Sequence, residues 1–152
     1  MRAYKLGENV EKEVTSVKHL LRFSIVGIAY FIVEVVWRIF MGHGEASFLM
    51  APMAGVVALV VFALEDRRLN VVFTSGVGAV TITTLELIVG SIALFGFGVR
   101  FWHYGRINWH GIIALDWFFK WWGLCLGVLI AKRLLEYFTK KRKEKKQNGT
   151  SV

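Results

Sequence analysis

The sequence lacks most of the residue patterns that carry enzymatic chemistry. It has a single cysteine, Cys125, so no disulfide can form within the chain. No Walker loop, no GxGxxG fingerprint and no serine, histidine and aspartate arrangement occurs, which excludes the usual nucleotide-binding and nucleophilic motifs. His103 and His110 lack a third metal ligand at a recognisable spacing. We therefore expect no catalytic activity, no bound metal and no cofactor.

Apolar side chains, by contrast, are in excess. Of the 152 residues 55% are hydrophobic, and the mean hydropathy is +0.51, which exceeds what a soluble domain of this size needs. These residues come in long blocks separated by short polar connectors, a pattern that favours helices stacked across a bilayer. No small-residue cleavage site follows the first block, so we expect no removed signal peptide. The sequence predicts an all-α integral membrane protein.

Four apolar blocks predict about four transmembrane helices, because each reaches or approaches the roughly 20 residues that cross a bilayer. The predicted spans are Phe23–Met41, Phe48–Leu64, Val71–Phe95 and Ile112–Ala131. Together they make one transmembrane domain over residues 23–131. Residues 1–22 have valine and leucine at helical spacing, which indicates either an amphipathic helix or a solvated terminus. Residues 132–152 form a basic tail.

The basic residues predict the orientation of these spans. Fifteen of the 19 lysines and arginines lie in the two termini and the connector 65–70, whereas only Arg100 and Arg106 lie in the other loops. By the positive-inside rule, both termini are cytoplasmic and the chain is a multi-pass protein of the cell membrane. The tail would attract anionic lipid headgroups, at about 1 kcal/mol per basic residue. This accounts for the net charge of +8 without a nucleic-acid partner.

The connector between the third and fourth spans, Gly96–Gly111, is rich in aromatic residues and glycine. It is too polar to cross lipid and too aromatic for an ordinary solvent loop, so we place it at the membrane interface. Its glycines would allow a re-entrant path. The predicted interfacial residues are Trp102, His103, Tyr104 and Asn108, with Trp109 as a further headgroup-level ring.

Ionisable residues inside the predicted spans are the strongest functional signal, since each costs about 3 kcal/mol to insert. Those residues are Glu34, Arg38, Glu86, Asp116 and Lys120. Two acid and base pairs are four residues apart, so each pair projects from one helix face. Both pairs fall in the outer half of the bilayer. We hypothesise that they meet, joined by Glu86, in a polar site between the first and fourth helices, with the aromatic loop as its lid.

Two other interpretations of these charges stay open. Each pair could neutralise itself near the interface, with Arg38 and Lys120 reaching outward to phosphates. In the second interpretation, these charged residues are buried in a contact between copies of the chain. Small residues at Gly123 and Gly127 have the GxxxG spacing that permits close helix contact. The glutamate-bearing stretches around Glu34 and Glu86 also indicate two similar hairpins, related as a parallel repeat.

The chain resembles the bacterial family of small membrane proteins labelled ABC-transporter permeases of the CmpB type. The resemblance covers roughly Phe23–Ala131, and its first part comprises Gly27–Glu34 and the FLMAP segment, Phe48–Pro52. The second part comprises Glu86, Gly90, the WHYG motif at Trp102–Gly105, Asn108, Gly111, Ile113, Leu115, Phe118 and Trp121. The resemblance implies a permease-like role. A chain this short would then need an ATPase partner and copies of itself.

Four classes of function compete. A permease-like transporter component with a polar intramembrane site comes first, on the intramembrane charges and the resemblance. A non-catalytic membrane scaffold or regulator that holds partners through the basic tail is the second. A phage-type holin is the third, because those proteins are also small, multi-spanning and end in basic tails. A membrane-embedded enzyme comes last, since no nucleophile or metal ligands accompany the acidic residues.

Overall fold

The computed structural model describes residues 2–41, 47–105 and 107–148, with side chains over 13–40, 47–105 and 107–144. The predicted N-terminal segment and tail therefore extend beyond it by Met1 and residues 149–152, and Arg106 also lies outside the described residues. Within those ranges the chain forms four α-helices: α1 (Arg2–Met41), α2 (Met50–Asp66), α3 (Val71–Ser91) and α4 (Leu115–Asn148). A π-helical turn, η1 (Ile92–Gly96), continues α3. The prediction of a helical protein is confirmed.

A short hairpin is the departure from an all-helical fold. Strands β1 (Asn108–Trp109) and β2 (Ile113–Ala114) pair antiparallel. His110 (φ 52°) and Gly111 (φ 76°) make the reversal between them, and the Ile112 N–H donates to the Trp109 carbonyl at 2.9 Å. Positive φ at both central positions is the geometry of a type I′ turn. The predicted fourth span from Ile112 is therefore wrong at its start, and α4 begins at Leu115.

Two helical stretches are long and apolar enough to cross a membrane within the described residues, Glu13–Phe40 and Val71–Gly96. The second matches the predicted third span to within one residue. The first contains the predicted span from Phe23 and extends further toward the N-terminus, because α1 is one uninterrupted helix of 40 residues. The opening segment thus leads directly into the first span. Helix α2, with 17 residues, is about 25 Å long and falls short of a 30 Å hydrocarbon layer.

Local signals explain where α2 and α3 begin. Pro52 lies in the first turn of α2, where its missing N–H leaves no helical hydrogen bond unmade. The Asn70 side chain caps α3 by accepting hydrogen bonds from the N–H groups of Val72 at 2.8 Å and Phe73 at 3.4 Å. Since the connector between the two helices is short, they pack side by side.

Glycines set the closest helix contacts. A Cβ on Gly27 of α1 would lie 2.6 Å from the Ala51 carbonyl oxygen of α2, so only glycine permits this approach. On α3, Gly78 faces Cys125 of α4, which is thereby packed. Nothing in the described part of the chain lies within 4 Å of a Cβ built on Gly123 or Gly127. The predicted close contact at the GxxxG motif is not made within this chain.

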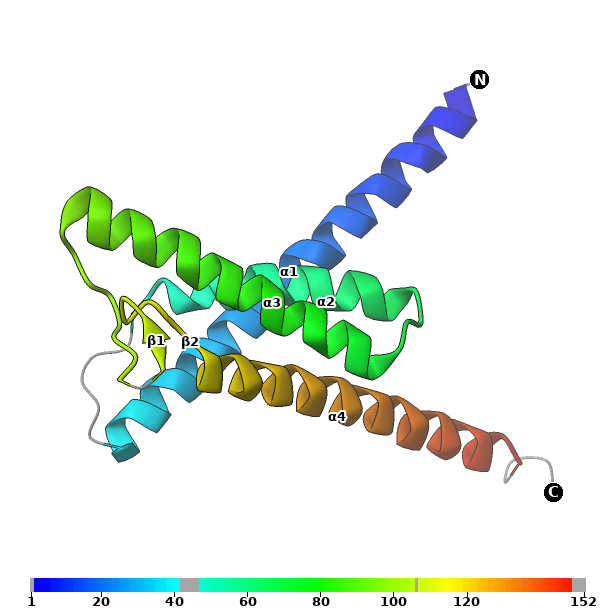
Figure 1. The fold of residues 1–152 in the computed structure, drawn as a ribbon. Coiled ribbons are helices and arrows are strands. Elements are labelled where there is room, and N and C mark those ends of the chain that lie inside the picture. The colour runs from blue at the N-terminus through cyan, green and yellow to red at the C-terminus, as the bar shows by residue number, and fades with distance from the viewer. Residues whose placement is uncertain (1, 42–46, 106, 149–152) are drawn as a thin grey trace.

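The chain termini and the β-hairpin lie at opposite ends of the helices (Figure 1). Figure 1 shows the N- and C-terminal ends of the chain and the α2–α3 turn at one end of the helices, with the β-hairpin at the opposite end. Helix α1 crosses the others obliquely and extends beyond them toward the N-terminus. The main buried cluster lies toward the hairpin end and contains Met50, Met53, Ala79, Ile82, Trp102, Tyr104, Ala114 and Trp121.

Candidate polar site

Glu86 is the most deeply buried ionisable group near the hairpin end. Its residue is only 1% exposed, on the face of α3 turned toward the aromatic connector. The Tyr104 hydroxyl donates a hydrogen bond to the Glu86 carboxylate. The indole of Trp121 lies beside the same carboxylate, and its buried N–H makes no well-formed hydrogen bond. Among the described residues no lysine or arginine pairs with Glu86.

Glu34 and Arg38 form the predicted pair on α1. The Arg38 Nε–H donates to Glu34 Oε1 at 2.6 Å, and the side chains are 23% and 14% exposed respectively. The other carboxylate oxygen of Glu34 accepts a hydrogen bond from the Tyr30 hydroxyl at 3.1 Å. Glu34 lies close enough to Glu86 for their charges to interact. The structure thus brings together three of the five predicted intramembrane charges.

An unbroken series of aromatic rings connects the two glutamates. The ring centroids of Tyr30 and Trp121 are 5.7 Å apart, those of Trp121 and Trp117 5.9 Å, and those of Trp117 and Tyr104 5.1 Å. Each tyrosine at an end of the series donates its hydroxyl to one glutamate. The rings come from α1, α4 and the connector, so the site exists only when these three elements are packed together.

Asp116 and Lys120 pair as predicted but lie at the edge of this site. Lys120 Nζ is 3.2 Å from Asp116 Oδ2, and the two side chains are 55% and 42% exposed. Lys120 Nζ also lies 4.1 Å from the centroid of the Trp117 ring. Neither residue makes a described hydrogen bond to Glu34 or Glu86. This pair therefore contacts the outer side of the aromatic series.

Two rings of the aromatic connector fold inward against the protein, while the place of the connector at the membrane interface stays a prediction. Trp102 and Tyr104 are 8% and 7% exposed. The Trp102 N–H donates to the Ile112 carbonyl at 2.9 Å, and the ring packs against Gly90 of α3. The physical reason is that Gly90 leaves space on α3 that the indole fills. Trp109, at 47% exposure, remains at the surface.

Asn108 fixes the shape of this connector. Its side-chain amide donates to the Tyr104 carbonyl at 2.7 Å, and its side-chain oxygen accepts from the Gly111 N–H at 2.7 Å. The Tyr104 N–H donates to the Gly111 carbonyl at 2.9 Å. Two of these hydrogen bonds hold the backbone of Tyr104 and the third ties Asn108 to Gly111, so Asn108 positions the tyrosine that reaches Glu86.

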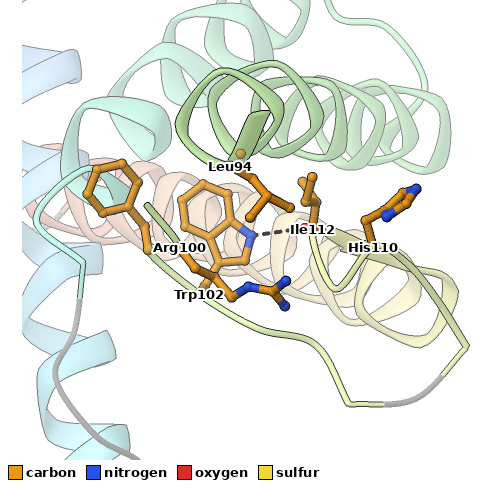
Figure 2. Close-up of a pocket in the computed structure, with 7 residues that line it drawn as sticks. Leu94, Arg100, Trp102, His110 and Ile112 are labelled. Atoms are coloured by element: carbon orange, nitrogen blue, oxygen red, sulfur yellow. Dashed lines mark hydrogen bonds between the residues drawn. The ribbon is translucent and has the colours of Figure 1, made fainter. Parts of the chain in front are cut away.

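His103 lies on the outer surface of the connector. Its Nδ1 is 2.5 Å from an Arg100 guanidinium nitrogen, and both side chains cover Gly111. No group of three or more metal-ligating side chains occurs in the described ranges. A small pocket lies beside this pair, lined by Gly90, Leu94, Arg100, Phe101, Trp102, His110 and Ile112. Figure 2 shows Trp102 at its centre, with the N–H directed at Ile112.

A second group of charges, at the terminal end of the helices, was missed from the sequence. Glu65 of α2 is 1% exposed and accepts two hydrogen bonds from Arg133 of α4, at 2.9 and 2.8 Å. Lys132 lies 3.7 Å from the same carboxylate. Asp66, the next residue, binds Arg22 of α1 at 2.6 and 2.9 Å. These pairs join α2 to α4 and to α1.

The guanidinium partners hold both carboxylates in the ionised form. The hydrogen bonds from Arg133 lower the pKa of Glu65 against the opposing effect of desolvation. The hydrogen bonds from Arg22 lower the pKa of Asp66 to about 2. The only sequence signal for these pairs was the charged connector after Leu64. The sequence alone does not indicate which arginine pairs with which carboxylate.

The fold and the site define a helical protein with two membrane-length apolar stretches and carboxylates buried between its helices. Residues 21–150 match the family described as "Putative ABC-transporter type IV", ABC_trans_CmpB. The chain belongs to this family, which confirms the resemblance stated from Glu86, WHYG and the residues after them. No curated protein and no solved structure matches the chain.

Proposed function

We propose that this protein is a permease-like component of a transporter in the cell membrane. Its substrate path would pass the polar site made by Glu34, Arg38 and Glu86, with Asp116 and Lys120 at the outer edge. The observation that carries the proposal is Glu86, a carboxylate that is 1% exposed and has no basic partner among the described residues. Ionisable groups at such positions cost several kcal/mol, about 3 or more in a bilayer, and are kept where they serve a function.

The proposed topology has four spans, with both termini in the cytoplasm. In Figure 1 the N-terminal end of α1, the α2–α3 turn and the C-terminal end of α4 all lie on the side away from the hairpin, which supports this topology because these segments carry most of the basic residues. In this topology the fourth span continues beyond Ala131. Lys132 and Arg133 turn toward Glu65, while the following apolar side chains are all more than half exposed, namely Leu134, Leu135, Tyr137 and Phe138.

The proposed partners follow from what the chain lacks and from the family. An ATPase subunit would supply the nucleotide site whose motifs are absent from this sequence, and copies of the chain would complete the pathway. Anionic lipid headgroups would bind the basic face of the tail, where α4 continues as a helix to Asn148. The packing of α1 on α2 and of α3 on α4 supports the two-hairpin repeat.

The experiment starts from cells in which the gene for this protein is deleted. These cells are complemented with wild type, Glu34→Gln, Glu86→Gln or the tail control Glu144→Gln, and the four strains are compared with the uncomplemented deletion strain. Mass-spectrometric profiling of intracellular solutes measures transport even though the substrate is unidentified. We expect one set of solutes to depend on the wild-type protein, to lose that dependence in both site variants and to retain it in the control. Unchanged profiles in both site variants, with the proteins present in the membrane, would contradict the proposed site.

A scaffold or regulator is the second candidate, because α4 projects as a continuous basic helix well past Ala131. Truncation after Thr139 distinguishes the two. Loss of function on truncation, with Glu34→Gln and Glu86→Gln fully active, selects the scaffold. Retained transport in the truncated protein selects the permease-like role.

A further inference from the structure

The polar site has an unbalanced charge. Its two carboxylates, on Glu34 and Glu86, face a single guanidinium, on Arg38, which binds Glu34. When all three groups are ionised, one negative charge remains on Glu86. Water does not reach this carboxylate, since the residue is 1% exposed. An uncompensated charge in such surroundings is strongly unfavourable, so the site favours a positively charged occupant and disfavours an anion.

The surrounding rings favour a particular kind of cation. Tyr104 from the connector and Trp121 from α4 contact Glu86, and the Trp117 ring packs against both of these rings. Aromatic faces attract cations, and clusters of such faces bind alkylated ammonium groups, which shed water easily. Trp117 already contacts a cation on its outer side, where Lys120 Nζ lies 4.1 Å from the ring centroid. The other ring neighbours of Trp117 are Tyr104 and Trp121.

One polar group in the site is incompletely bonded. The Trp121 N–H lies beside the Glu86 carboxylate but makes no well-formed hydrogen bond to it, and the residue is 7% exposed. Such a donor is less stable than one with a fully formed hydrogen bond. A ligand that brings an oxygen acceptor next to Glu86 would satisfy it.

We propose that the site between Glu86, Trp117 and Trp121 binds a small organic ammonium ion that carries a hydroxyl or another oxygen acceptor. The inference rests on the proposed function and names the substrate class of the same site. The ammonium group lies against Glu86 and the tryptophan faces and takes the place of the Tyr104 hydroxyl. The ligand oxygen accepts the hydrogen bond of the Trp121 N–H.

The proposed route to this site begins at the hairpin end. Gly90 is one helical turn from Glu86 on the same face of α3. The Trp102 ring covers Gly90 and lines the small outer pocket. The proposed entry step is therefore a displacement of the Trp102 ring, which covers Gly90, and of the Tyr104 side chain, which contacts Glu86.

The test uses purified full-length protein in lipid nanodiscs and follows intrinsic tryptophan fluorescence, because two tryptophans line the site. The probes are choline, its uncharged isostere 3,3-dimethylbutan-1-ol and the anion 3,3-dimethylbutanoate. We expect a saturable response to choline and none to the other two at equal concentration. Glu86→Gln weakens choline binding about tenfold or more, whereas the tail variant Glu144→Gln binds like wild type.

Tyr104→Phe provides a variant whose predicted effect is opposite. It keeps the ring but removes the hydroxyl that competes for Glu86, so we expect choline to bind at least as tightly as to wild type. If Glu86→Gln does not fold, this variant together with Trp117→Leu, which we expect to weaken binding, decides the question.

Equal responses to choline and to the uncharged isostere would overturn the inference in favour of a neutral solute. No response to choline in folded wild type, or an unchanged response in Glu86→Gln, would overturn it as well. If Glu86 binds only a proton, choline gives no response, and this result also overturns the inference. The proposed function is judged separately by solute profiling: a non-cationic solute that depends on Glu86 there would leave transport standing and remove only the cation.

Discussion

At the scale of single residues, burial decides what a charge contributes to stability. Glu65 and Asp66 are neighbours that each bind an arginine from another helix, but Glu65 is 1% exposed and the Asp66 side chain is 41% exposed. A buried pair has lost its hydration, so removal of one partner leaves the other charge unsatisfied. An exposed pair exchanges its partner for water at little cost.

We therefore predict different costs for two adjacent substitutions. Glu65→Gln should lower the free energy of unfolding by about 1–3 kcal/mol, because Arg133 loses its two hydrogen bonds to a carboxylate at a residue that is 1% exposed. Asp66→Asn should lower it by about 1 kcal/mol or less. Denaturant unfolding in detergent, followed by tryptophan fluorescence, measures both. Equal costs would mean that the Glu65 pair is as solvated as the Asp66 pair.

The pair of Asp66 and Arg22 predicts that the stability of the protein depends on pH. The pKa of Asp66 lies at about 2, below its usual value of 3.8, so the folded state binds its proton more weakly than the unfolded state. The stabilisation is complete above pH 3.8 and is lost as the pH falls toward 2. The stability difference between wild type and Asp66→Asn should therefore shrink across this interval. A difference that is constant from pH 5 to pH 2 would contradict the assignment.

At the scale of elements, the aromatic connector depends on backbone geometry. Gly111 has φ of 76°, and a Cβ there would lie 2.3 Å from His103 Nδ1. Gly111→Ala should therefore destabilise the hairpin by about 1–3 kcal/mol and release Tyr104 from Glu86. Gly105→Ala is the matched control, because a Cβ at Gly105 meets nothing within 4 Å among the described residues.

Protease sensitivity of the connector, together with thermal unfolding in detergent, measures this effect. We expect Gly111→Ala to be cut faster than wild type and Gly105→Ala to be cut at the wild-type rate. Similar behaviour of the two alanine variants would show that the turn does not hold the connector in place.

Elements were predictable from the sequence where the signal is local. Pro52 and Asn70 mark helix starts, and the four-residue spacing of Glu34 and Arg38 predicts their pair. The inward path of Trp102 depends on the space at Gly90, and the partner of Glu65 lies 68 residues away. Such features arise from tertiary packing, so hydropathy and spacing do not reveal them.

At the scale of the whole molecule, the proposed site depends on how many helices cross the membrane. Among the residues that the structure describes, two stretches qualify by length and hydropathy alone. The proposed second and fourth spans end at a shared group of charges, where Lys132 and Arg133 of α4 contact Glu65 of α2. In the proposed topology these charge pairs lie at the cytoplasmic ends of the two spans.

Substituted-cysteine labelling in intact cells tests this topology most directly. In a Cys125→Ala background, single cysteines replace Ser16, Arg68, Gln147 or Gly105, and a membrane-impermeant thiol reagent is applied from outside. We predict that only the cysteine at position 105 is labelled before lysis and that the other three are labelled after it. Labelling at position 147 or 68 in intact cells would contradict the four-span arrangement and, with it, the proposed site.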